Sequence, residues 1–342
     1  VQSSRSINFF GVEATNSFIM RKYLIPMVVM IAALTSCSKS DKITLVDSTG
    51  RINNVLVVMN NEDWEGRVGD SLRQILAQPL PGLPQEEFPF TVNQVDPITF
   101  NSLFKRNRNI LFIGVDTLKH FYSNTNLYAN PQLTLTILGR DKDELIENMM
   151  SHSDELISTF KDNDLRLYQY KVAKDSHNPK EINTFNNLGL QFKIPVAYRM
   201  VEDTGDFMWY RSTITRGLLN LIAYEIPVGD MSQVDEDALI RFRDSIGKKY
   251  IPGQFDSTYM TTEKLERPIV KEVEVAGRKA LESRGLWYVE NDYMGGPFLS
   301  YTFKDEESGR LIVIEGFSYT PSAKKRDFVF ELEAILKTVS FQ

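Results

Sequence analysis

Apolar runs alternate with helix-spaced apolar positions through the first half of the chain. Residues 55–59 are apolar at every position and end at a polar segment, which is typical of a buried strand. Further strands are predicted over 90–95, 110–115 and 133–138, and helices over 68–77, 98–104 and from about 141 through several turns. This alternation predicts an N-terminal α/β domain over residues 51–175.

The second half of the chain is richer in strand patterns. Residues 207–211 and 218–226 resemble a hairpin, and residues 311–314 are apolar at every position, as in a central strand covered on both faces. Amphipathic helices are predicted over 235–248 and at the end of the chain. We expect a C-terminal α+β domain over residues 176–342, with a mainly antiparallel sheet flanked by helices. The chain as a whole is therefore predicted to be a two-domain α+β protein.

The first apolar run has the layout of a lipoprotein signal peptide. Met20-Arg21-Lys22 is basic, residues 23–33 are apolar, and Leu34-Thr35-Ser36-Cys37 ends at the chain's only cysteine. The run is far shorter than the roughly 20 residues that span a bilayer. We expect cleavage before Cys37 and lipid attachment, palmitate included, at its thiol; the alternative is an ordinary signal peptide with an incidental cysteine. Residues 1–36 are then an over-extended start plus the signal peptide, with a genuine leader ahead of the signal as the alternative for residues 1–19, and residues 37–50 are a tether.

Residues that follow the acylated cysteine sort bacterial lipoproteins between membranes. Ser38 is not the aspartate that favours the inner membrane, and Asp41 is the only acidic residue close behind Cys37. We therefore expect an outer membrane lipoprotein on the periplasmic face, with the cell surface as the alternative. The membrane is the first expected partner.

Charge and composition exclude several classes of function. The formal net charge is −6 and 42% of residues are hydrophobic, so a globular chain is expected without the basic surface that nucleic acid requires. With Cys37 acylated, no thiol remains for a disulfide or a thiolate metal site. His120, His152 and His177 lack the spacing of paired metal ligands. We expect no metal and no cofactor.

Aromatic residues near a glycine turn are the first ligand-binding candidates. Trp287, Tyr288 and Tyr293 precede Gly295-Gly296-Pro297-Phe298, and Trp209 and Tyr210 lie on a neighbouring predicted strand. Exposed rings beside such a turn would suit a sugar or a peptide. Ordinary core packing is the alternative for each of them.

A basic run near the last helix is the second candidate. Lys324, Lys325 and Arg326 lie close to the predicted start of the helix, where cations oppose the helix dipole. A helix start lined with basic groups can hold a phosphate or a carboxylate. The alternative is a solvated charge run.

No recognisable catalytic motif accompanies these candidates, so no catalytic residue is predicted. There is no Gly-x-Ser-x-Gly, no phosphate-binding glycine loop and no dinucleotide fingerprint. We expect a lipid-anchored binding or scaffolding protein of the cell envelope, whose partner is an envelope protein or a glycan. The alternative is an envelope hydrolase for glycans or peptides, with carboxylates gathered from distant acidic clusters. These clusters lie at 62–63, 202–203, 235–237 and 305–307.

Two resemblances extend this interpretation. Residues 189–195 and 206–210, together with the final strand and helix, resemble the corresponding parts of PsbP-like domains, which implies an antiparallel sheet between helices and an adaptor role. From Cys37 onward the chain resembles an uncharacterised Bacteroidetes-type lipoprotein family, a domain of unknown function. That likeness is carried by the lipobox, residues 60–66, Arg284-Gly285-Leu286-Trp287 and Gly295-Gly296-Pro297-Phe298. It implies a compartment and no activity.

Overall fold

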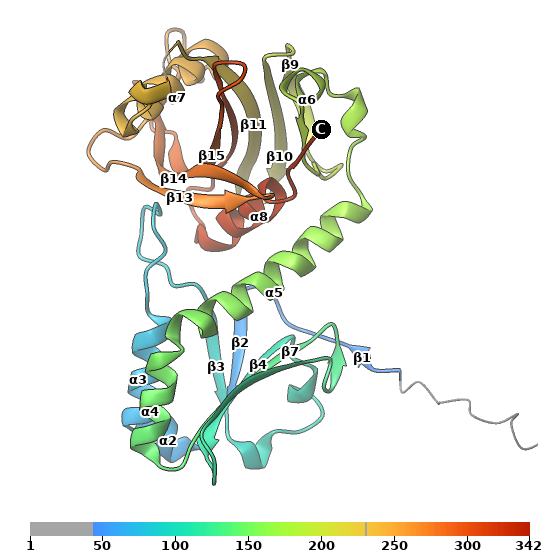
Figure 1. The fold of residues 1–342 in the computed structure, drawn as a ribbon, viewed down its shortest axis with the longest axis vertical. Coiled ribbons are helices and arrows are strands. Elements are labelled where there is room, and N and C mark those ends of the chain that lie inside the picture. Colours follow the sequence, from blue (N-terminus) through green and yellow to red (C-terminus); the bar gives the residue numbers. More distant parts are fainter. Residues whose placement is uncertain (1–43, 230) are drawn as a thin grey trace, which may run out of the picture. The chain divides into compact units, whose positions relative to one another are not determined.

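A computed structural model describes residues 44–229 and 231–342, and Figure 1 shows its helices and strands. The first half contains a five-stranded sheet in the order β3-β2-β4-β7-β5. The strands are β2 (Asn54–Val58), β3 (Thr91–Val95), β4 (Asn109–Val115), β5 (His120–Thr125) and β7 (Leu133–Gly139). β2, β3, β4 and β7 pair in parallel, and β5 is antiparallel to β7. Apolar side chains on both faces of β2 and β4 make them interior strands.

Four helices accompany this sheet. They are α2 (Asn61–Glu65), α3 (Arg67–Leu76), α4 (Lys142–Ser151) and α5 (Ser153–Lys174). The long helix predicted from residue 141 is divided between α4 and α5 at His152, whose Nδ1 lies 2.9 Å from the carbonyl oxygen of Asn148. The helix predicted over 98–104 is wrong. Asp96 caps a single 3₁₀ turn there, and a second turn follows (Pro97–Thr99 and Phe104–Arg106).

The second half contains an antiparallel sheet in the order β12-β14-β15-β16-β11-β10-β9, with β13 also paired to β14. Its strands are β9 (Arg199–Asp203), β10 (Phe207–Ile214), β11 (Gly217–Pro227), β12 (Met260–Thr262), β13 (Ile269–Val275), β14 (Arg278–Val289), β15 (Gly295–Asp305) and β16 (Arg310–Tyr319). The predicted hairpin is β10–β11, and the predicted central strand is β16, which lies between β11 and β15. Residues of α7 (Glu236–Tyr250) and α8 (Arg326–Leu336) belong to different core clusters of this sheet.

The remaining helices and strands are short. They are β1 (Val46–Asp47), β6 (Ala129–Asn130), β8 (Leu190–Gln191), β17 (Ser340–Phe341), α6 (Asn183–Leu188) and the 3₁₀ turns Pro179–Glu181 and Met231–Gln233. The mixture of helices with a largely antiparallel sheet makes the fold α+β, as predicted. Residues 46–342 form one compact unit, so the division into two domains at residue 175 stays a prediction.

A proline-rich connection between α3 and β3 reaches the second sheet. We call residues 77–90 the proline loop. Gly82 has a φ of +73°, and a Cβ placed on it would lie 2.8 Å from the backbone nitrogen of Gly285 on β14. Only a residue without a side chain can make this approach in a left-handed conformation. The loop is therefore fixed to β14 at the Arg284-Gly285 step.

The predicted lipid anchor cannot be placed on this fold. The signal peptide, Cys37 and the first part of the tether lie outside the described residues. Within residues 44–229 and 231–342, no helix combines the length and apolarity that a membrane span requires.

Candidate functional site

Trp209 and Tyr210 are core residues rather than surface rings. Successive residues of β10 face opposite sides of the sheet, so Trp209 enters the core beneath α7 and Tyr210 the core beneath α8. Trp209 Nε1 donates to Asn220 Oδ1 at 2.9 Å, and the guanidinium of Arg211 lies 4.4 Å from the indole centroid. Because helices cover both faces, the core alternative describes both aromatic residues.

The remaining three aromatic candidates differ in exposure. Trp287 is buried, with its ring 5.3 Å from that of Phe317. Tyr288 is half-buried and donates from its hydroxyl to Glu290 at 3.0 Å. Tyr293 has a relative exposure of 104%, so its ring makes no packing that would explain an aromatic residue there.

These three residues line one open groove of about 350 Å³, which we call the Tyr293 groove. Its other lining residues are Pro84, Gln85, Glu263, Leu286, Asp292, Met294, Gly295, Gly296, Pro321 and Lys325. A Cβ on Gly296 would lie 2.0 Å from the carbonyl oxygen of Ser318, so glycine is required where β15 approaches β16. The two glycines therefore shape both the groove and the beginning of β15.

Asp292 lines the groove and has one unsatisfied carboxylate oxygen. Its Oδ1 accepts a hydrogen bond of 2.6 Å from the backbone N–H of Tyr293. Its Oδ2 is buried and has no hydrogen-bond partner within the described part of the chain. A buried carboxylate oxygen without a donor is costly, so this oxygen suits a ligand hydroxyl or amide. Sequence patterns did not identify Asp292, because a single aspartate in a turn has an ordinary structural role.

The basic run is divided between three environments. Lys324 is exposed, Lys325 lines the Tyr293 groove, and Arg326 begins α8. The anion at this helix start is the chain's own Glu87. Its Oε1 accepts from the backbone N–H of Lys325 at 2.6 Å, and its Oε2 accepts from that of Arg326 at 3.1 Å. An external anion would have to displace Glu87 from this position.

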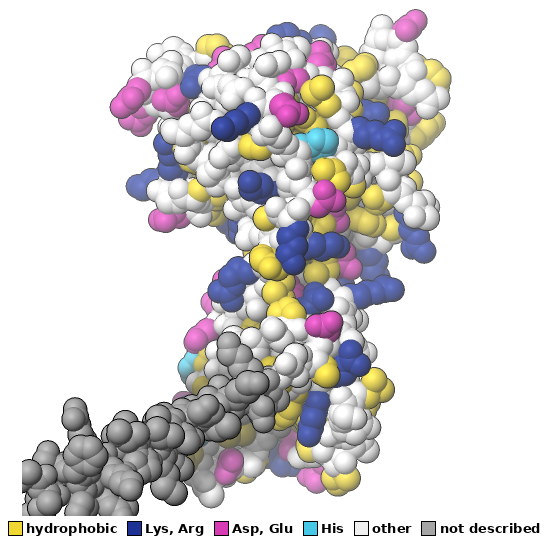
Figure 2. Space-filling model, turned by 90° about the vertical axis from the view of Figure 1, so that its right-hand side faces the viewer, with side chains coloured by type: hydrophobic (Ala, Val, Ile, Leu, Met, Phe, Trp, Pro, Cys, Tyr) yellow, Lys and Arg dark blue, Asp and Glu magenta, His cyan; other side chains and the backbone are white. Residues whose placement is uncertain are grey.

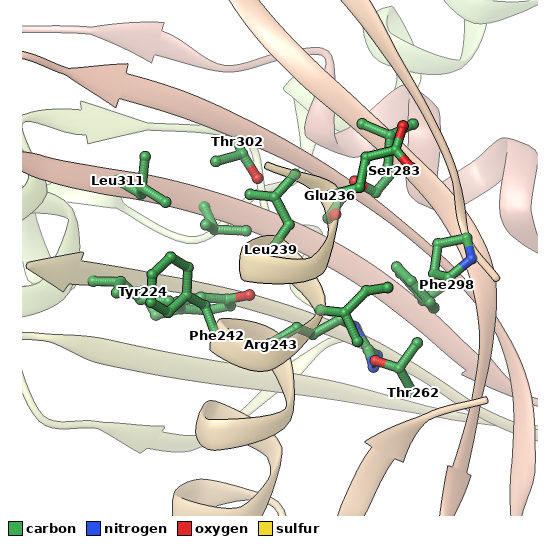
Figure 3. A pocket seen from close by; sticks show the side chains of 16 residues that line it. Tyr224, Glu236, Leu239, Phe242, Arg243, Thr262, Ser283, Phe298, Thr302 and Leu311 are labelled. Carbon is green, nitrogen blue, oxygen red and sulfur yellow. The ribbon is translucent and has the colours of Figure 1, made fainter. Parts of the chain in front are cut away.

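A second pocket lies between α7 and the sheet. Figure 3 shows Leu239, Phe242 and Arg243 of α7 beside Tyr224, Leu311 and Phe298 of the strands. The space left between them is only about 20 Å³, which is room for roughly one water molecule. This pocket is a packed core in the described structure and holds no free space for a ligand.

The acidic clusters have local structural partners. Asp63 pairs with Lys142, Asp203 accepts from the first N–H groups of α6, and Asp235 caps α7. Asp305 pairs with Arg310 at 3.0 Å. Within residues 44–229 and 231–342, no group of three or more His, Cys, Asp or Glu side chains could hold a metal ion.

The comparisons with known proteins place this α+β chain beside uncharacterised domains. A family model described as Domain of unknown function (DUF8532) matches residues 48–173, and one described as Domain of unknown function (DUF4837) matches residues 176–338. Both matches fit the expected uncharacterised family. No curated protein matches the chain.

Solved structures show only weak likeness. A crystal structure from Bacteroides thetaiotaomicron VPI-5482 has 8% identity and a TM-score of 0.27, over 46% of this chain and 46% of that one. LpqN, involved in cell envelope biogenesis of Mycobacterium tuberculosis, has 10% identity and a TM-score of 0.29, over 45% and 83%. The human StarD13 lipid transfer and protein localization domain has 10% identity and a TM-score of 0.21, over 42% and 89%. Scores this low assign neither a fold nor a function.

Proposed function

We propose that this protein is a lipid-anchored binding module of the cell envelope, and that the Tyr293 groove holds a glycan. The observation that carries this proposal is the combination of an exposed Tyr293 ring with the unpartnered Oδ2 of Asp292 in one groove. In this proposal Cys37 bears the lipid, the outer membrane is the site of anchoring, and the second half is a PsbP-like domain with an adaptor role.

The groove has the chemistry that a sugar requires. The apolar face of a pyranose can stack on an exposed tyrosine ring, while carboxylate and amide side chains bond its hydroxyls. Tyr293 provides such a ring, and Asp292, Glu263 and Gln85 provide polar groups around it. Burial, and then the hydrogen bond to Glu290, raise the pKa of Tyr288, so its phenol stays protonated at neutral pH.

Binding is favoured over hydrolysis because the acidic clusters already have structural partners. A glycosidase needs one carboxyl that holds a proton and a second that faces it across the substrate. The acidic clusters at residues 62–63, 202–203, 235–237 and 305–307 each contribute a carboxylate to a cap or an ion pair. Asp292 and Glu263 both line the groove and are the carboxylates that a hydrolase would use there. Hydrolysis would be detected as release of reducing ends from the glycan.

The glycan proposal is tested by cosedimentation of the full chain with purified peptidoglycan sacculi and, in a separate arm, by binding to purified lipopolysaccharide. We expect binding to one of them, weakened at least tenfold by Tyr293→Ala and by Asp292→Asn. Tyr170→Ala is the matched control, because this exposed tyrosine lies on α5 outside the groove. Binding to neither glycan, or binding unchanged by Tyr293→Ala, overturns the proposal. Reducing-end release that depends on Asp292 and Glu263 would favour the hydrolase.

The anchor is tested independently of the ligand. Cys37→Ala should abolish labelling by a clickable palmitate analogue and move the protein out of the membrane fraction. Ser38→Ala is a neighbouring control that should label and sediment normally. A Cys37→Ala protein that still labels and still sediments with membranes would contradict acylation at this residue.

A further inference from the structure

A cavity of about 250 Å³ lies between the proline loop and residues of α5, β13, β14 and α8. It is lined by Asn53, Gln78, Pro79, Leu80, Pro81, Leu83, Pro89, Phe90, Ile157, Lys161, Lys271, Arg284, Arg326, Val329, Phe330 and Glu333. We call it the charged cavity, because four of its side chains are cationic and one is a carboxylate. The two sites share no lining residue. On the face drawn in Figure 2, which is the side of the molecule away from the proline loop, Lys and Arg side chains also lie among hydrophobic ones.

Arg284 is the central group of this cavity. It is 8% exposed, and its Nη2 donates to Glu333 Oε2 at 2.9 Å. Its Nε donates to Glu282 Oε1 at 2.9 Å, so two carboxylates hold the guanidinium plane in place. Lys161 Nζ lies 2.9 Å from Glu333 Oε1, and Lys271 Nζ lies 3.2 Å from Glu282 Oε1. The cation is therefore rigidly positioned before any ligand arrives.

One nitrogen of Arg284 remains free for a ligand. The hydrogen bonds of this guanidinium to described residues use Nε and Nη2, whereas Nη1 donates none. An arginine carries five N–H donors, and those on Nη1 have no acceptor among the described residues. A buried guanidinium with unused N–H groups at the wall of a cavity suits an anionic oxygen.

Two carboxylates already occupy most of the guanidinium of Arg284. Glu282 and Glu333 are both ionised. Burial alone would raise the pKa of each carboxyl, but the neighbouring cations have the larger effect. They hold the pKa of Glu282 at about 2 and that of Glu333 well below its usual range. Beyond its bonds to described residues, only Nη1 is left to donate to a ligand, so this arginine offers room for one carboxylate rather than for the several oxygens of a phosphate monoester.

The remaining wall is apolar. Leu80, Phe90, Ile157, Val329 and Phe330 come from the proline loop, α5 and α8, and they offer hydrocarbon contact beside the charged residues. The volume lies just below the roughly 300–1,000 Å³ typical of small-molecule sites, so the cavity fits a small ligand. We propose that the charged cavity binds a small monocarboxylate with an apolar body, its carboxylate at Arg284 and its body against Leu80 and Phe330.

The proposal is tested by calorimetric titration of the full chain carrying Cys37→Ala with sodium octanoate, 1-octanol and octyl phosphate. We expect saturable binding of octanoate, at least tenfold tighter than that of octanol and tighter than that of octyl phosphate. Equal affinity for octanol would show that Arg284 contributes nothing. Tighter binding of octyl phosphate would overturn the assignment to carboxylates, and absence of saturable octanoate binding would overturn the site.

Two variants locate the binding. Arg284→Lys keeps the charge but leaves one nitrogen to serve two glutamates, so we expect octanoate affinity to fall at least tenfold. Leu80→Trp should fill the cavity and have the same effect; unchanged affinity in Leu80→Trp refutes the location even where Arg284→Lys fails to fold. Arg216→Lys and Leu265→Trp are matched exposed controls. Tyr293→Ala should leave octanoate binding unchanged, which separates this site from the glycan groove.

Discussion

Gly82 lies directly against Arg284. A Cβ on Gly82 would come within 2.9 Å of Arg284 Cβ and 2.8 Å of the backbone nitrogen of Gly285. This contact joins the proline loop to the strand that carries the central guanidinium of the charged cavity. Two residues about 200 positions apart in the chain are thereby held in van der Waals contact beside the charged cavity.

Gly82→Ala should destabilise the protein more than a turn glycine normally does. The left-handed φ of +73° costs a residue with a side chain about 1–2 kcal/mol, and the contact with β14 adds a steric term. Gly189→Ala is the control, because its φ is +68° but no atom lies within 4 Å of its added Cβ. We expect urea denaturation to show a loss for Gly82→Ala at least about 1 kcal/mol larger than for Gly189→Ala. Equal losses would mean that the loop moves away without cost.

Glu87→Gln should weaken the start of α8. The Glu87 carboxylate accepts from the backbone N–H groups of both Lys325 and Arg326, as a capping group does, and its charge is favourable at this end of a helix. We expect a loss of about 1–2 kcal/mol in urea denaturation and faster hydrogen exchange in the first turn of α8. Glu86→Gln changes the adjacent exposed carboxylate and should have little effect. Similar losses in the two variants would contradict a capping role for Glu87.

The strands of this fold were predictable where apolar runs reflect burial on both faces. The runs at 55–59 and 311–314 belong to interior strands β2 and β16 for that reason. β5 was not predicted, because this edge strand is largely exposed and its sequence is polar. Trp209 and Tyr210 were ligand-binding candidates with core packing as the alternative, because the pattern could not show that both faces of β10 are covered.

The sites were less predictable, since they depend on distant pairs. Arg284 and Glu333 are 49 positions apart, and Arg243 and Glu315 are 72 apart. Residues so far apart in the chain form no motif, so the sequence does not indicate that they are paired. Tyr293 was predicted from its neighbouring glycine turn, whereas Asp292 becomes notable only when its Oδ2 is seen to lack a donor within the described residues.

Acid should destabilise the protein through Glu282. Its folded pKa is held at about 2, against an ordinary value of 4.5, because Arg284 and Lys271 outweigh its burial. Between these values the unfolded chain binds the proton and the folded one does not, so stability is fully present above about pH 5 and is lost as pH falls towards 2. At 1.36 kcal/mol per pKa step, the share of Glu282 is up to about 3 kcal/mol.

Urea denaturation at several pH values measures this share. Glu282→Gln should flatten the pH dependence of the unfolding free energy between pH 5 and pH 2, whereas Glu307→Gln in an exposed turn should leave it unchanged. The pKa of Glu333 is also lowered, so this residue makes stability fall with pH in the same direction. Part of the pH dependence therefore remains in Glu282→Gln. An unchanged curve for Glu282→Gln would contradict the ion-pair arrangement around Arg284.

Arg243 and Glu315 form a buried ion pair beneath α7, with side chains 6% and 0% exposed. Arg243 Nη2 lies 2.7 Å from Glu315 Oε1, its Nη1 donates to Thr262 at 2.9 Å, and its guanidinium lies 3.8 Å from the Phe298 centroid. Removing one partner of such a pair leaves a buried charge without compensation, which costs about 3–5 kcal/mol. Arg243→Met should therefore be severely destabilising, whereas Arg241→Met on the exposed side of α7 should be mild.

The double variant Arg243→Met/Glu315→Gln separates loss of charge compensation from loss of packing. It should recover much of the stability lost in Arg243→Met, because a neutral amide is cheaper to bury than a carboxylate. Burial already raises the pKa of Glu315, and removing Arg243 removes the charge that opposes the rise. A folded pKa above the unfolded one gives stability that is present at low pH and lost as pH rises. Arg243→Met should thus be closer to wild type at pH 5 than at pH 8 in urea denaturation, and a gap that widens on acidification would refute the uncompensated Glu315 carboxylate as its cause.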